Sequence, residues 1–143
     1  MDCPINAKRM IIGGLAAGVA INVIETVAHM CVLGERYANL TKMGFYLPEP
    51  RYNFMPVWIG FCFFFGLILS WLYAASRGTF KPGPVTALKV GIMAGLLVAL
   101  SATLPSLAWS SVGKLVPVVT GASLFLDCAI GTLIAGACYK PKQ

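Results

Sequence analysis

The sequence predicts an all-α integral membrane protein, a four-transmembrane-helix bundle that runs up-down-up-down, with an aromatic outer loop between the first two helices. Of the 143 residues, 58% are hydrophobic and only 11% are charged, which is more apolar than a soluble domain of this length can bury. Four segments also reach the roughly 20 apolar residues that a helix needs to cross the hydrocarbon core. We therefore expect one transmembrane domain over residues 1–143, and neither a soluble enzyme nor a disordered chain.

The predicted spans cover roughly residues 10–33, 55–75, 85–109 and 115–139. The first follows Lys8 and Arg9, as a signal peptide would, but it is too long and lacks a small-residue cleavage site, so we expect it to be retained. The links at 76–84 and 110–114 are short, which favours antiparallel neighbours.

The basic residues predict how the spans are oriented. Seven lie on the side of the two termini and four on the other side, which predicts that both termini lie in the cytoplasm. Because these charges are scattered at membrane ends, we expect lipid and not nucleic acid as their partner. The two sets are Lys8, Arg9, Arg77, Lys81, Lys89, Lys140 and Lys142, against Arg36, Lys42, Arg51 and Lys114.

The loop at 34–54 is rich in aromatic residues. Tyr37, Leu40 and Met43 are spaced three apart, so residues 35–44 are expected to form a short helix in the interface. The loop is either a lid on the bundle or a docking surface for a partner protein.

Each span carries small residues at four-residue spacing, which form one thin face on a helix. Such faces let helix backbones approach closely in lipid. We expect them to pack within the chain, with a homo-oligomer or hetero-complex face as the alternative. The glycines of these rows are Gly14, Gly18, Gly66, Gly91, Gly95 and Gly131.

An intramembrane polar cluster is predicted from five residues. Asn22, Glu25, Thr26 and His29 follow one another at i, i+3, i+4 and i+7, which places them on one face of the first helix. Asp127 lies in the fourth span at a similar depth. A charged group at the centre of a membrane helix costs about 2.5–3.5 kcal/mol, so these side chains are expected to face the bundle and to meet if the two helices are neighbours.

This cluster has three possible roles. It is a polar clasp that fixes helix register, a proton or cation site, or a contact with a partner subunit or its cofactor. A lone membrane His can also bind haem or chlorophyll, but Glu25 occupies the position four before His29, where a small residue would open space for the ring. The sequence has no metal-binding motif, so we expect no metal and no cofactor.

Two stretches carry a family resemblance. Residues 71–77 (WLYAASR) and 82–87 (PGPVTA), together with Asn22 and Glu25 in a glycine-rich first helix, resemble a broad group of uncharacterised small four-helix bacterial inner-membrane proteins with no known activity. The resemblance implies a helical bundle in a bacterial inner membrane and transfers no activity.

The sequence contains no nucleophile or phosphate-binding motif, so we expect no enzyme. The expected function is a non-catalytic accessory or structural subunit of a larger bacterial membrane complex, such as a respiratory or photosynthetic electron-transport assembly, with other membrane subunits as partners. The alternative is a small oligomeric proton-coupled transporter or channel that uses the intramembrane carboxylates.

Overall fold

The computed structural model describes residues 5–139, and its regular structure within this range is entirely helical. Four helical segments are long and apolar enough to cross a membrane, which confirms an all-α chain with four candidate spans. Asn6 accepts a hydrogen bond from the Arg9 backbone N–H at 3.3 Å, and this cap starts the first helix earlier than expected. The elements are α1 (Ala7–Thr26), the π-helix η1 (Val27–Val32), α2 (Gly34–Lys42), α3 (Phe54–Ser76), α4 (Pro84–Trp109) and α5 (Leu115–Cys138).

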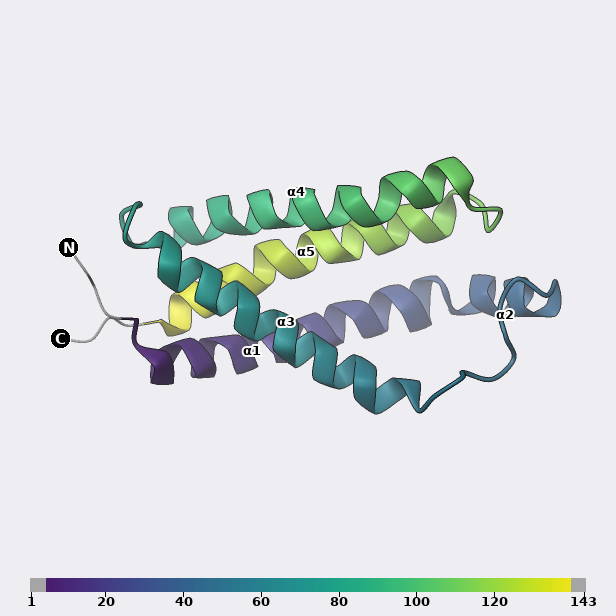
Figure 1. The fold of residues 1–143 in the computed structure, drawn as a ribbon, viewed down its shortest axis with the longest axis horizontal. Helices are drawn as coiled ribbons and strands as arrows, with labels where there is room; N and C mark the ends of the chain where they lie inside the picture. Colours follow the sequence, from purple (N-terminus) through teal and green to yellow (C-terminus); the bar gives the residue numbers. More distant parts are fainter. Residues whose placement is uncertain (1–4, 140–143) are drawn as a thin grey trace.

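The helices α3 and α5 each contact the other three long helices, and α5 packs most extensively against α4. Figure 1 shows α4 alongside α5, while α3 crosses α1 at an angle. The short helix α2 lies at one end of the bundle, and the first and last described residues lie at the other. Polar residues of α5 therefore lie where three helices can surround them.

The glycines of the small-residue rows stand at these helix crossings. A Cβ atom on Gly66 of α3 would clash with the Gly14 backbone oxygen and would lie 2.6 Å from the Gly18 backbone nitrogen of α1. A Cβ atom on Gly91 of α4 would meet the side chain of Thr132 and lie 2.7 Å from the Cys128 carbonyl oxygen of α5. Gly95 faces Phe125, and Gly131 faces Leu69. Glycine is required at Gly66 and Gly91 because the backbone of the neighbouring helix occupies the space of a side chain, whereas the atoms nearest to Gly131 belong to side chains.

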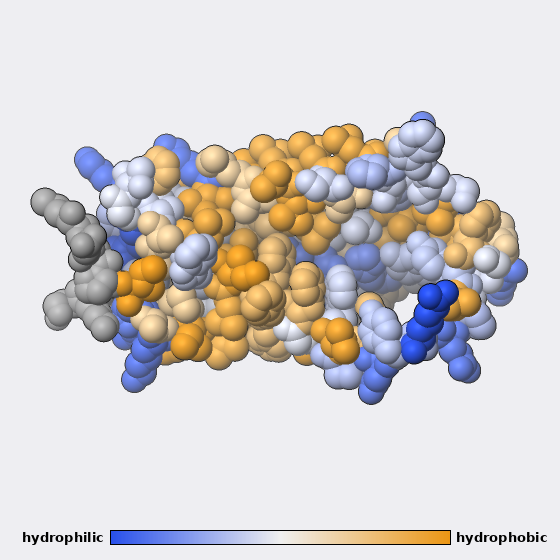
Figure 2. Space-filling model, viewed as in Figure 1, coloured by the Kyte–Doolittle hydropathy of each residue, from blue (hydrophilic) through white to orange (hydrophobic). Residues whose placement is uncertain are grey.

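The outer surface of the long helices is apolar. Figure 2 shows a hydrophobic middle with hydrophilic atoms gathered toward both ends of the molecule. Met93 and Leu97 on α4 are each 71% exposed, although both side chains are strongly apolar. An apolar surface of this extent is stable only against lipid or other apolar partners, so the chain is a multi-pass membrane protein.

Different contacts close the two ends of the bundle. At the end of the termini, the Asn6 backbone N–H donates to the Tyr139 hydroxyl at 3.0 Å, and the Arg77 guanidinium lies 4.9 Å from the centre of the Tyr139 ring. At the opposite end, Leu33 and Leu40 pack against Val116 at the start of α5. The helix α2 overlaps the short helix expected at 35–44, although it begins and ends earlier, at Gly34 and Lys42, and these contacts dock it against the bundle.

Candidate functional site

The site is built around Glu25, whose side chain is 3% exposed in the last turn of α1. Directly after this turn, the α-helix gives way to the wider π-helix η1, which carries His29. The His29 Nε2 atom lies 3.1 Å from Glu25 Oε2, within ion-pair distance but without the alignment of a hydrogen bond. Single π-helical turns recur at functional sites, and this one occurs where the buried acid meets the only histidine.

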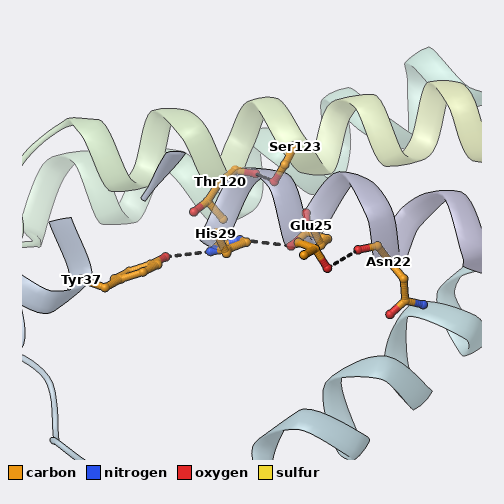
Figure 3. Close-up of polar contacts among 7 residues, drawn as sticks. Asn22, Glu25, His29, Tyr37, Thr120 and Ser123 are labelled. Carbon is orange, nitrogen blue, oxygen red and sulfur yellow. Dashed lines mark hydrogen bonds and ion pairs between the residues drawn. The ribbon is translucent and has the colours of Figure 1, made fainter. Parts of the chain in front are cut away.

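Tyr37 of α2 extends the contact toward the end of the bundle. Its hydroxyl lies 2.8 Å from His29 Nδ1, and Figure 3 shows Tyr37, His29 and Glu25 in one row. The docking of α2 positions this hydroxyl, because Arg36 of the same helix donates to the Val112 carbonyl oxygen at 3.1 Å. Burial raises the pKa of the Tyr37 hydroxyl, so it keeps its proton at neutral pH and can donate it to the imidazole.

Asp127 of α5 completes the site and is 1% exposed. Its carboxyl group and that of Glu25 lie close enough to interact directly, and Ser123, one turn earlier on α5, also lies within reach of Glu25. Neither oxygen of Asp127, nor Oε1 of Glu25, receives a hydrogen bond from a described residue. The neighbourhood of α1 and α5 therefore brings two buried carboxyl groups together with few donors around them.

The charges of this site do not balance when both acids are ionised. Among residues 5–139, Glu25 forms its one ion pair with His29, and the Arg36 guanidinium is directed to a carbonyl oxygen outside the pair. One imidazolium can balance one carboxylate, while an uncompensated ion in an apolar interior costs several kcal/mol. One of the two acids must therefore carry its own proton or meet a cation from outside the chain.

The structure separates the five residues of the predicted cluster into two groups. Glu25, His29 and Asp127 come together, whereas Asn22 donates to the Gly18 carbonyl oxygen of its own helix at 2.8 Å. Thr26 is exposed and donates to the Asn22 carbonyl oxygen at 2.7 Å. This corrects the expectation that Thr26 faces the bundle, because Thr26 follows Glu25 directly and one residue turns an α-helix by about 100°.

Two residues of the site were not in the predicted cluster. Tyr37 was expected only as a residue of the short interfacial helix, and Ser123 belongs to the row of small residues at four-residue spacing in the last span. Tyr37 reaches His29 through the docking of α2, and Ser123 reaches Glu25 through the packing of α5. Neither contact therefore follows from spacing within one helix. Trp58 of α3 also lies edge-on to His29, with ring centres 6.2 Å apart.

The contacts of His29 bear on cofactor binding. Both ring nitrogens face protein oxygens, Nδ1 toward Tyr37 and Nε2 toward Glu25, so this placement leaves no ring nitrogen directed at a haem or chlorophyll. In the described range, no three His, Cys, Asp or Glu side chains are grouped so that they could hold a metal ion.

No protein-family model matches this chain, and no match was found among curated proteins or solved structures. The class of the protein therefore follows from its own fold and site. It is a multi-pass helical membrane protein that buries two adjacent carboxyl groups between α1 and α5.

Proposed function

We propose that this chain is a small proton-coupled transporter in which Glu25 and Asp127 bind and release a proton inside the membrane. The observation that carries the proposal is the pair of adjacent carboxyl groups, 3% and 1% exposed, with three acid oxygens that receive no hydrogen bond within the described chain. Buried acids of this kind mark proton and ion pathways in membrane proteins, because their charge is too costly to retain for packing alone.

Tyr37 and His29 supply a route for the proton. When Glu25 is ionised, its oxygens only accept, so the facing Nε2 atom of His29 carries a proton and Nδ1 accepts from the Tyr37 hydroxyl. Transfer of the Nε2 proton to Glu25, with transfer of the Tyr37 proton to Nδ1, moves one positive charge toward the acid pair. A proton from water at the α2 end then restores the Tyr37 hydroxyl.

The other side of the pair favours a transporter over an open channel. Toward the end of the termini, Ile21 and Leu69 are each 1% exposed and apolar. Thr132, also buried, donates to the Cys128 carbonyl oxygen of its own helix at 2.7 Å. These side chains offer no continuing chain of exchangeable protons, so release to that side requires a second arrangement of the helices.

We place the transporter in a bacterial inner membrane as an up-down-up-down bundle, with both termini in the cytoplasm and α2 in the aromatic outer loop. The excess of basic residues on the side of the termini supports this orientation, as do the shared end of α1 and α5 in Figure 1 and the ring contact of Tyr37 with Tyr46 in the loop. Lys140 and Lys142, two of the seven basic residues on that side, lie outside the described residues.

A non-catalytic accessory subunit stays a prediction. The contacts among the described residues bear on the carboxyl pair and not on a partner subunit. The oligomeric state of the transporter and the resemblance to small four-helix bacterial membrane proteins likewise stay predictions.

Proton flux into liposomes tests the proposal. The purified chain is reconstituted with a pH-sensitive dye inside the vesicles, valinomycin holds the membrane potential, and the outside is acidified. We expect dye acidification faster than in protein-free vesicles, and we expect Glu25→Gln and Asp127→Asn to lower it to that background. His29→Gln should slow the flux about tenfold or more, because it removes the relay and leaves the acids in place.

Glu35→Gln is the matched control, since it makes the same change at an exposed acid of α2. It should leave the flux unchanged, and size-exclusion profiles should show that all variants remain folded. No flux from the unmodified chain, or full flux from Glu25→Gln, contradicts the proposal.

A further inference from the structure

A groove of about 360 Å³ runs along the bundle between the end of α1, η1 and α5. Its size lies at the lower end of the range for small-molecule sites. Its walls are almost wholly apolar, and Val23, Val27 and Leu126 on them are about half exposed at 59%, 50% and 46%. In a membrane protein, a groove with such a rim opens sideways to the hydrocarbon, so a molecule dissolved in the bilayer can reach it directly.

Ser123 is the polar residue of this groove. It is 3% exposed, its hydroxyl donates to the Thr120 carbonyl oxygen at 3.0 Å, and it lies within reach of the Glu25 carboxyl group. Figure 3 shows Ser123 and Thr120 on α5 next to the row that contains Glu25. The apolar groove therefore includes one hydroxyl side chain that lies near the buried acid pair.

The charge of the pair selects the head group of a ligand in this groove. Glu25 Oε1 and both oxygens of Asp127 are buried without a hydrogen-bond donor. The titratable groups near Glu25 are His29 on η1, Asp127 on α5, the Cys62 thiol on α3 and, beyond His29, the Tyr37 phenol on α2, so two acids stand against one imidazole. A carboxylate head group would be repelled here, whereas an ammonium would supply the missing positive charge and several N–H donors.

We propose that this groove binds a lipophilic amine, with its apolar body between η1 and α5 and its ammonium group at Glu25 beside Ser123. The inference rests on the proposed function and names its substrate class. Counted from the ammonium in water, the amine leaves one proton in the solvent as it enters the bilayer and takes up one proton from the acid pair in the groove, so binding and proton release are linked one to one. The amine and the proton then compete for one carboxylate, which is the coupling that exchange across a membrane requires.

Three probes with the same body test the head group. The chain in nanodiscs is titrated calorimetrically with 1-aminoadamantane, 1-adamantanol and 1-adamantanecarboxylic acid, against empty nanodiscs. We expect the amine to bind at least about tenfold more tightly than the alcohol or the acid. Glu25→Gln should remove this preference, and the apparent affinity for the amine should fall as the pH is lowered. Titrations in buffers of different ionisation enthalpy should show release of about one proton for each amine bound.

Filling the groove tests its location. Ala122 is an exposed lining residue, so Ala122→Leu fills the groove without entering the core, and it should weaken amine binding about tenfold or more. The matched control is Ser101→Leu, which fills another lipid-facing groove on α4 and should leave amine binding unchanged.

The outcomes separate this inference from the proposed function. Equal binding of the three probes, or unchanged amine affinity in Ala122→Leu, overturns the amine site even where proton flux persists. Selective amine binding without proton flux, even in liposomes loaded with 1-aminoadamantane, supports the amine site and contradicts the proton-coupled transporter.

Discussion

The two ends of the bundle use polar residues in different ways. Near the termini, polar groups join helices to one another: the Ser70 hydroxyl of α3 donates to the Met10 carbonyl oxygen of α1 at 2.7 Å, and the Asn6 N–H donates to Tyr139. Toward α2, Glu25 and Asp127 are equally buried, yet three of their oxygens receive no hydrogen bond from a described residue. Polar groups at the first end stabilise packing, while those at the second remain available to a proton or a cation.

The helix geometry differs in the same way. Gly14, Gly18 and Gly66 bring α1 and α3 into direct backbone contact in the half of α1 that leads from the termini. Beyond Glu25, the chain leaves α-helical geometry for the π-helix η1, and a groove opens beside it. Close glycine contacts therefore characterise one end, while the proposed proton site lies where the helix widens at the other end.

The largest expected effect follows from breaking the end with the close glycine contacts. Gly66→Ala places a Cβ atom against the Gly14 and Gly18 backbones, and backbone atoms cannot move aside as a flexible side chain can. We expect a loss of about 3 kcal/mol in the free energy of unfolding, measured by denaturant titration in detergent.

Gly60→Ala is the control for this change, because it lies on the same helix and a Cβ atom there meets nothing within 4 Å. It should be neutral or stabilise the protein by up to about 1 kcal/mol, as alanine favours a helix over glycine. Equal destabilisation by both substitutions would mean that backbone contact does not hold this crossing.

The sequence predicts the glycine crossings better than the site around Glu25. Apolar length is a local property, so the four spans follow from the sequence. Small residues repeat at four-residue spacing within each helix, so the row containing Gly66 is visible before its partner helix is known. The sequence does not show which helices are neighbours, because similar apolar helices encode little about their pairing.

The same limit applies to the site around Glu25, where contacts between helices do not follow from spacing along one helix. The sequence places Glu25 and His29 on one helix face because they are four residues apart. It gives no sign of the π-helix, nor of the Tyr37 contact, which depends on α2 folding back over the end of the bundle. It also places Thr26 in the cluster, since an i, i+4 pattern alone does not show where a helix face ends.

A smaller effect is expected from loosening α2 with alkali. The fold holds the Tyr37 phenol in its neutral form, and burial raises its pKa above the ordinary value of about 10. The docking energy of this hydroxyl is therefore complete below about pH 10 and is lost as the pH rises through the raised pKa. We expect α2 to loosen by about 1 kcal/mol, seen as increased mobility of a spin label at Lys42→Cys in a background without other accessible thiols.

Tyr37→Phe is the control for the alkaline transition. The label in this variant should show the same mobility at pH 8 and pH 11, because no phenol remains at position 37 to ionise. A transition that persists in Tyr37→Phe would assign the loosening to another group and separate α2 docking from Tyr37.

The smallest effect is expected at Thr26, and it tests whether proton flux depends on Glu25 alone or also on its neighbour in the sequence. Thr26 lies next to Glu25 in the sequence, but its hydroxyl is exposed and bonds to its own helix. Thr26→Val keeps the shape of the side chain and removes that hydroxyl, so the free energy of unfolding should change by less than about 0.5 kcal/mol and proton flux should match the unmodified chain. The liposome assay that detects Glu25→Gln measures this directly. A loss of flux in Thr26→Val would show that the proton pathway runs along the lipid-facing side of α1, where Thr26 is exposed.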